Sequence, residues 1–211
     1  MTRTDPGNDA AAQSRGRRML LLLAALFLVP LAVSFWLYYG SAWRPSGTVE
    51  RGQLVSPAVP LPEVVLPLAP GAASPATAPG FLKDKWTVVF VGDGACDARC
   101  RKALVDSRQV RLALDKDMDR VQRVFLFRGD CCENGWLEAE HPGLLAVRVD
   151  GPEAATLLSP FDAAAGGQAM LSGRLYLVDP LGNLMMSYAP DVPAQDLLKD
   201  LERLLKLSHI G

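Results

Sequence analysis

The sequence predicts a small α/β domain with a mixed central sheet, preceded by a single membrane-spanning helix. Three features of the 211 residues lead to this prediction: an uncharged apolar run near the N-terminus, alternating strand and helix patterns after residue 80, and a final pair of strands joined by a short turn. Strands separated by helices pair in parallel and strands joined by a short turn pair antiparallel, so the sheet is mixed. The formal net charge of −1 gives no electrostatic basis for binding nucleic acid.

The N-terminal region predicts a tail followed by a membrane anchor. Residues 1–18 are polar and end in crowded arginines, which predicts a short disordered tail. Residues 19–39 are uncharged and, at about 1.5 Å per residue in a helix, are long enough to cross a hydrocarbon core of about 30 Å. Trp36, Tyr38 and Tyr39 at the far end resemble an interfacial aromatic belt. We therefore expect one membrane-spanning helix.

The charges around the apolar run predict its orientation. The arginine cluster before the run outweighs the basic residues after it, which places the N-terminus in the cytoplasm. The expected location is the bacterial inner membrane, with a single pass and the C-terminal domain in the periplasm. The alternative is a cleaved signal peptide, whose apolar region is normally about 7 to 15 residues and ends at small residues. This run is longer and ends in aromatic residues, which favours an anchor.

A connector rich in Pro, Gly, Ala and Ser is predicted for residues 40–80. Residues 71–80 have the composition of a plain linker. Residues 53–68 are more apolar than a flexible spacer requires, so they either form an edge strand of the domain or lie on a partner in the membrane.

The domain is predicted to cover residues 81–207. Its first strands and helices are expected, in chain order, at a strand 86–91, a helix from 97 to about 117, a strand 121–127, a short helix near Trp136, a strand 144–149 and a helix beginning at Pro152. A hairpin follows, with one strand ending at Val178, a turn over 179–183 and a second strand from Leu184. Residues 193–207 close the domain as an amphipathic helix with one leucine stripe. This order is the thioredoxin-like arrangement.

Cys96 and Cys100 are the principal candidates for a functional site. Four cysteines are too few to be the disulfide scaffold of a chain this long, which favours metal or redox chemistry. If the first turn of the helix includes both residues, their Cβ atoms lie about 5 to 6 Å apart. That spacing suits a shared soft metal or a reversible disulfide. The helix N-terminus and the nearby Arg99 and Arg101 favour thiolates, and the flanking glycines and charges predict exposed sulfurs.

Cys131 and Cys132 follow the second strand, at the sheet edge where the Cys96 loop is also expected. Ligands and reactive groups collect at the carboxyl ends of parallel strands, so one of these thiols is a candidate third ligand or resolving cysteine. The alternative is an ordinary loop pair, since adjacent cysteines do not easily bridge each other.

Other donor and acid side chains are weaker candidates. The histidines are His141, which reads as a turn residue or a ligand, and His209 near the C-terminus. Thioether sulfurs suited to copper(I) are offered by Met170, Met185 and Met186. Asp93 and Asp97 could assist proton transfer, but turn formation and helix capping are the favoured roles.

Two motifs resemble the Sco/SenC family of cytochrome c oxidase assembly proteins. They are G-D-G-A-C-D-A-R-C at 92–100 and R-L-Y-L-V-D-P-L-G-N at 174–183. The C-x-x-x-C spacing and the single N-terminal anchor are similar to this thioredoxin-fold family. Residues 38–57 also resemble a segment of small anchored proteins associated with bacterial cytochrome oxidase genes.

The resemblance implies an assembly factor that handles copper(I), or reduces thiols, at the oxidase copper centre. Its partner would be an oxidase subunit or another assembly factor, and Cys96 and Cys100 would be both the metal ligands and the redox-active residues. The family's ligand histidine is missing, because residues 170–173 read M-L-S-G at its expected place. Two alternatives follow: a scaffold protein with a structural disulfide and no metal, and a general thiol-disulfide oxidoreductase. The absent proline before the hairpin strand argues against the second.

Overall fold

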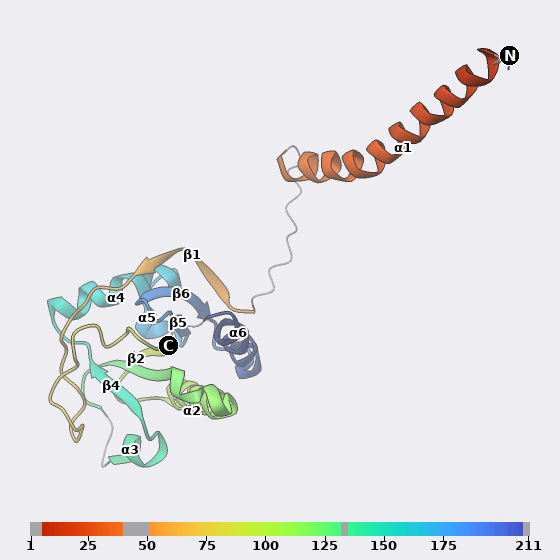
Figure 1. Cartoon of the computed structure of the whole chain (residues 1–211). Coiled ribbons are helices and arrows are strands. Elements are labelled where there is room, and N and C mark those ends of the chain that lie inside the picture. Colours follow the sequence, from red (N-terminus) through yellow and green to blue (C-terminus); the bar gives the residue numbers. More distant parts are fainter. Residues whose placement is uncertain (1–5, 40–50, 132–134, 209–211) are drawn as a thin grey trace. The chain divides into compact units, whose positions relative to one another are not determined.

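The computed structural model describes residues 6–39, 51–131 and 135–208. The chain divides into two compact units, residues 1–48 and 49–211, and each is described by itself. The first unit consists of the helix α1 and the second is an α/β domain (Figure 1).

Helix α1 (Pro6–Tyr39) begins earlier than predicted. Residues 6–18, expected as a disordered tail, continue the helix, because the alanines and other good helix formers in this stretch extend a helix already nucleated by the apolar run. Residues Arg17–Leu37 are long and apolar enough to cross a membrane. The helix changes direction part-way along (Figure 1), and Pro30, which cannot donate the usual backbone hydrogen bond, lies within it.

The second unit is built on a six-stranded mixed sheet. Its strands are β1 (Gln53–Pro60), β2 (Trp86–Asp93), β3 (Val121–Arg128), β4 (Leu144–Arg148), β5 (Leu175–Val178) and β6 (Asn183–Tyr188). Their order across the sheet is β1-β6-β5-β2-β3-β4. Strands β2, β3 and β4 are parallel, and β5 pairs antiparallel with both β2 and β6. The predicted mixed thioredoxin-like sheet is therefore confirmed.

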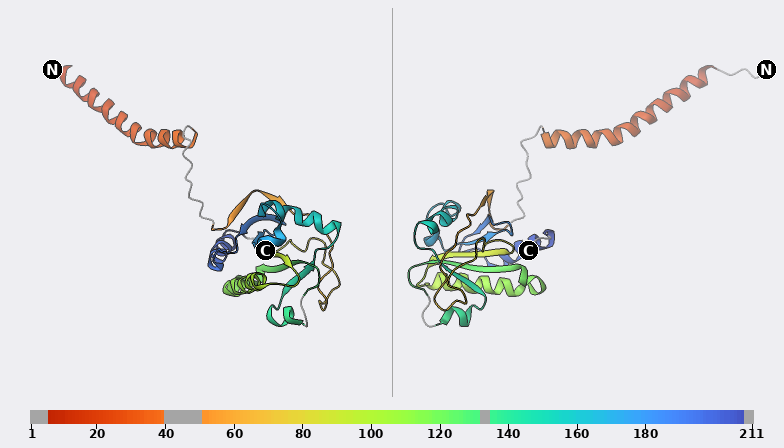
Figure 2. Two further views of the ribbon diagram at one scale, coloured as in Figure 1. Left: turned by 180° about the vertical axis from the view of Figure 1, so that it is seen from behind. Right: turned by 60° about the vertical axis from the view of Figure 1, so that its left-hand side comes forward.

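Helices cover both faces of the sheet, as the two views in Figure 2 show. On one face lie α2 (Ala98–Ala113) and α6 (Ala194–Leu207), with the short α3 (Trp136–Glu140) beside them, and on the other lie α4 (Pro152–Ala165) and α5 (Ala169–Ser172). Helix α2 ends earlier than predicted and is followed by a 3-10 helix, η1 (Asp115–Arg120). Helix α5 was not predicted, because four residues are too few to show a helical period.

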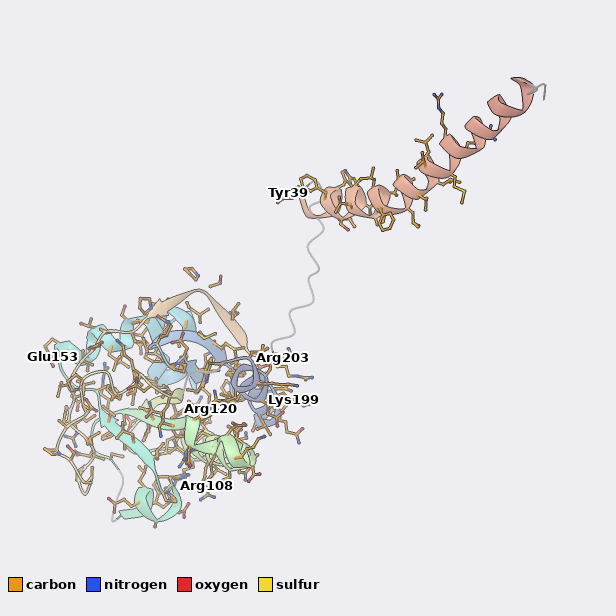
Figure 3. The ribbon with its side chains drawn as sticks, in the orientation of Figure 1. Tyr39, Arg108, Arg120, Glu153, Lys199 and Arg203 are labelled. Atoms are coloured by element: carbon orange, nitrogen blue, oxygen red, sulfur yellow. A yellow bond between two sulfur atoms is a disulfide. The ribbon has the colours of Figure 1, made fainter. Side chains whose placement is uncertain are left out.

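Alternating residues of the strands fill a separate core on each face. Val89, Val124 and Tyr176 pack under α4, whereas Val88 and Leu177 pack under α2 and α6. Helix α6 has the predicted amphipathic pattern: Leu197 and Leu201 are buried, and Lys199 and Arg203 point away from the domain (Figure 3).

Much of the predicted connector packs against the domain. Strand β1 pairs antiparallel with β6, so the edge-strand alternative for residues 53–68 is the one observed. Leu61 and Leu66 are buried in the core under α4. Residues 71–80 also differ from a plain linker, because Thr77 is buried and exchanges hydrogen bonds with Leu66: its Oγ1 accepts from the Leu66 N–H at 3.1 Å, and its own N–H donates to the Leu66 carbonyl at 2.9 Å.

A buried carboxylate fastens the start of this segment to α6. Asp200 is 5% exposed and accepts hydrogen bonds from the N–H groups of Arg51 and Gly52, at 3.0 and 3.1 Å, and from the Tyr188 hydroxyl at 3.0 Å. Burial, followed by the negative charge of Asp200, raises the pKa of Tyr188 and keeps its hydroxyl protonated as a donor. Three donors thus compensate the buried charge of Asp200.

Candidate redox and metal site

The loop after β2 is shaped by a close contact between two backbones. The N–H of Gly94 donates to the carbonyl of Arg128 at 2.9 Å, and a Cβ at Gly94 would lie 2.4 Å from the carbonyl oxygen of Asp130. Only glycine fits there, so the loop that follows β3 lies directly against the one that leads to Cys96. The side chain of Asp93 accepts from the N–H of Ala95 at 2.8 Å, which confirms its turn-forming role.

Helix α2 begins directly after Cys96. Asp97 is its N-cap and accepts from the N–H of Cys100 at 2.9 Å, which confirms the predicted cap. This hydrogen bond, together with the nearby Arg99, holds the pKa of Asp97 below its usual value. Arg101 donates from Nε to the carbonyl of Cys96 at 3.3 Å, so a second cation borders the loop.

Cys96 and Cys100 form a disulfide, with their Cα atoms 5.1 Å apart. Cys96 lies before the helix with a φ of +45°, so the two cysteines do not share a helical turn as expected, although the sulfurs still meet. The predicted exposure is wrong, because Cys96 and Cys100 are only 4% and 3% exposed. They pack beside the rings of Phe90 and Phe127, which come from the neighbouring strands β2 and β3.

A cleft of about 230 Å³ nevertheless reaches the disulfide. Its wall combines the two cysteines and Arg99 with Met170 and Leu171 from α5. Leu171 is 71% exposed, so the cleft has an apolar side chain at its rim. The cleft is the route by which a small ion or a partner's thiol could approach the sulfurs.

The second cysteine pair is only partly described. Cys131 is disulfide-bonded and packs, half-buried, against the same core cluster as Cys96 and Cys100. While Cys131 is in a disulfide, its sulfur cannot act as a thiolate ligand. Cys132 and His209 lie outside the described residues, so the roles predicted for them remain predictions.

His141 lies at the opposite edge of the sheet, in the turn before β4. It is 1% exposed, and burial followed by the charges of Arg123 and Arg108 lowers its pKa. Neither imidazole nitrogen has a hydrogen-bond partner among the described residues. His141 lines a separate cavity of about 320 Å³ beside α3, so the structure does not bring it to the cysteines.

The three candidate methionines lie in different surroundings. Met170 lines the disulfide cleft. Met186 is 2% exposed and its Sδ lies 3.5 Å from the Tyr188 hydroxyl oxygen, while Met185 packs against the core under α2 and α6. Of the cleft-lining residues that the structure describes, Met170 is the one thioether donor.

Residues 86–208 match the model of a protein family described as "transmembrane-like, thioredoxin-like, C-terminal domain". The match spans more than half of the sequence, and the fold built around the Cys96 loop agrees with it. The chain belongs to this thioredoxin-like family. No curated protein matches the sequence.

Solved structures with the same fold include Sco proteins and a DsbF homologue. The copper-bound ScoI of Arabidopsis thaliana is 16% identical, with a TM-score of 0.56 over 70% of this chain and 99% of that one. BsSco, a member of the Sco family of cytochrome c oxidase assembly proteins with a described disulfide switch, is 13% identical, with a TM-score of 0.52 over 74% and 99%. A DsbF homologue from Corynebacterium diphtheriae is 21% identical, with a TM-score of 0.52 over 76% and 96%. These likenesses confirm the expected fold.

The donors present in this thioredoxin-like domain suit a soft metal ion. Among the described residues there is no group of three or more His, Cys, Asp or Glu side chains placed to hold a metal. The cleft offers two cysteines, which are ligands only after reduction, and one thioether, beside the carboxylates of Asp93 and Asp97, which already accept backbone hydrogen bonds. Thiolate and thioether sulfurs are soft donors of the kind that suit copper(I).

Two features of this domain were not predicted from the sequence. Arg123 is 2% exposed in the middle of β3; its Nη2 donates to the carbonyl of Pro142 at 2.8 Å, but Nε and Nη1 have no partner among the described residues. Burial lowers its pKa to about 10, which still leaves it charged at neutral pH. The sequence pattern that could have predicted this buried charge is an arginine within an otherwise apolar strand. The contact between Gly94 and the Asp130 backbone had no signal beyond a glycine in a loop.

Proposed function

We propose that this protein is a membrane-anchored assembly factor for cytochrome c oxidase that handles copper(I), or exchanges thiols, through Cys96 and Cys100. Helix α1 holds it in the bacterial inner membrane with a cytoplasmic N-terminus, and the thioredoxin-like domain works in the periplasm. The observation that carries the proposal is a disulfide at the carboxyl edge of the sheet, reached by a cleft that a thioether also lines. Copper and oxidase assembly are named for solved proteins of the same fold.

The chemistry alternates between two states of the sulfurs. A dithiol reductant transfers two electrons and two protons to the disulfide, so the S–S bond breaks, two thiols form and the reductant becomes a disulfide. Copper(I) then displaces both thiol protons and binds the two thiolates. The helix N-terminus and Arg101 favour the thiolate form of these sulfurs. Transfer of the same two electrons to a partner's disulfide would restore the Cys96–Cys100 bond without metal.

Copper(I) titration of the full chain in detergent tests the metal function. The protein carries Cys131→Ser and Cys132→Ser to remove other thiols, is reduced with a dithiol without oxygen, and is titrated against a chromophoric copper(I) chelator. We expect tight binding of a single ion that disappears when Cys96→Ser and Cys100→Ser are added. Equal binding with and without these last two substitutions would overturn the metal function.

The orientation is tested by a fusion after residue 211. Alkaline phosphatase folds to an active form only where its disulfides can form, so the proposed topology predicts an active enzyme at this position. An inactive alkaline phosphatase fusion, paired with a fluorescent fusion that matures in the cytoplasm, would reverse the proposed topology.

The low exposure of both cysteines favours a second candidate function. A disulfide that is 3–4% exposed also suits a scaffold protein in which the bond is structural and no metal binds. A strain lacking the protein, complemented with the Cys96→Ser/Cys100→Ser chain, separates the two candidates. Oxidase activity that persists with this variant but is lost when residues 1–48 are deleted supports the scaffold. Loss of oxidase activity with both the cysteine variant and the deletion supports the proposed copper or thiol function.

A further inference from the structure

We infer that Met170 supplies a third sulfur donor, so that the reduced protein holds copper(I) between Cys96, Cys100 and a thioether. This inference rests on the proposed copper function and deepens it, because it assigns the metal a three-sulfur site built from this chain's own residues.

The structure selects Met170 from the methionines considered in the sequence. It lines the same cleft as both cysteines, opposite the loop that carries them. The thioether of Met186 is enclosed in the core, 3.5 Å from the Tyr188 hydroxyl oxygen, and Met185 packs against the core cluster under α2 and α6. Of these three methionines, only Met170 therefore lines the cleft that both cysteines line, while it also packs against the core under α4.

The segment that carries Met170 is fixed at both ends. At its start, Ala169 is fully buried and its N–H donates to Oδ1 of Asp162 at 2.7 Å. At its end, Ser172 Oγ lies 3.2 Å from the Tyr176 hydroxyl and accepts from the N–H of Arg174 at 3.2 Å. Asp162 belongs to α4 and Tyr176 to β5, and Met170 packs against the core that these two elements share, so the backbone of α5 is fixed on the α4 face of the sheet. A donor placed in advance loses little entropy when it binds an ion.

The donor set explains how the site could work without a histidine. A thioether is soft and uncharged, so it stabilises copper(I) without adding to the charge of the two thiolates. The copper(I) dithiolate carries a net negative charge, and Arg101 beside Cys96 can compensate it, whereas Arg99 in the cleft wall is already paired with Asp97 at 3.4 Å.

Matched substitutions test the affinity. Met170→Leu removes the sulfur with little change in volume, and Met185→Leu is the control elsewhere in the fold. In the Cys131→Ser/Cys132→Ser background, we expect Met170→Leu to weaken copper(I) binding by at least about 10–100-fold. This is the loss that usually follows removal of a residue that only orients a metal ligand. Met185→Leu should leave the affinity unchanged, and Met170→His should restore most of the loss. Circular dichroism and thiol counting establish that each variant is folded and reduced.

X-ray absorption at the copper edge gives a readout that a merely structural role of Met170 would not move. In selenomethionine-labelled protein loaded with copper(I), a direct ligand adds copper–selenium scattering, which should vanish in Met170→Leu and persist in Met185→Leu. Absence of this scattering, with unchanged affinity in Met170→Leu, would overturn the inference while leaving copper binding by the two cysteines intact. Absence of cysteine-dependent binding in the parent protein would overturn the proposed copper function itself.

Discussion

The two edges of the parallel β2-β3-β4 segment hold their polar side chains in opposite ways. At the carboxyl edge, Asp93 and Asp97 accept backbone hydrogen bonds and position a disulfide beside an open cleft. At the amino edge, Arg123 and His141 are enclosed with nitrogen atoms that have no partner among the described residues. From the sequence His141 was a turn residue or a weaker candidate ligand, and in the structure only the carboxyl edge combines donors, partners and access. The difference shows that a candidate ligand is defined by what shares its cavity, because residue type alone made His141 a candidate.

The largest expected effect is at the carboxyl edge. Gly94→Ala would place a Cβ 2.4 Å from the carbonyl oxygen of Asp130, and because both groups are backbone the two loops must separate. We expect a loss of about 3 kcal/mol in unfolding free energy, measured by denaturant titration, and weaker copper(I) binding. Gly167→Ala is the control, because nothing lies within 4 Å of its Cβ position, and it should change stability by less than about 0.5 kcal/mol. Equal stability of the two variants would contradict the tight contact.

At the amino edge, Arg123→Met should stabilise the protein. It replaces a buried guanidinium, which Arg108 and Arg111 repel and which no carboxylate among the described residues pairs, by an apolar chain of similar length. We expect a gain of about 2 kcal/mol in denaturant unfolding and no change in copper(I) affinity. Arg128→Met, an exposed position on the same strand, should stay within about 0.5 kcal/mol of the parent protein. A marked loss of stability in Arg123→Met would mean that the guanidinium has a stabilising partner.

His141 should make the domain sensitive to mild acid. Its pKa is lowered on folding, so below about pH 6.5 the unfolded chain takes up a proton that the folded state resists. Stability should therefore be insensitive to this group above that pH and fall by up to about 1.4 kcal/mol per pH unit below it, until the lowered pKa is reached. Denaturant midpoints measured across this range should show a smaller slope in His141→Phe. An identical slope would rule out His141 as its source.

The smallest effect concerns the cap of α2. Asp97→Ala removes the acceptor for the Cys100 N–H and should cost about 1 kcal/mol in unfolding free energy, whereas Asp97→Asn keeps an acceptor and should cost only a few tenths. The pKa of Asp97 is lowered on folding, so the cap's contribution is present above the unfolded pKa and is lost as the pH falls through the folded pKa. Equal losses in the two variants would mean that charge, rather than the cap hydrogen bond, stabilises this helix end.

Local patterns in the sequence predicted most of the domain. Short apolar runs predicted β2, β3 and β4, the turn residues predicted the β5-β6 hairpin, and the leucine stripe predicted α6. The location of Cys96 and Cys100 between a strand and a helix was also predicted, because it depends only on neighbouring residues.

The remaining features depend on contacts between distant parts of the chain. The cysteines are buried by aromatic rings from β2 and β3, and residues 53–80 gain structure from β6 and from the core under α4. Which methionine faces the disulfide was undecided, since it depends on how α5 is tied to α4 and β5. No periodicity in the sequence carries such information.

The hydrogen bonds from Arg51 and Gly52 to Asp200 have a mechanical consequence. A pull on the chain from its N-terminal side enters the domain at Arg51, so the load falls first on the Asp200 carboxylate and then on the β1-β6 ladder. Strand β1 is at the far side of the sheet from β3 and β4, with β6, β5 and β2 between. Tension would therefore act on β1 and its contacts at the edge of the sheet. The Cys96–Cys100 disulfide would keep its geometry while the chain is under load.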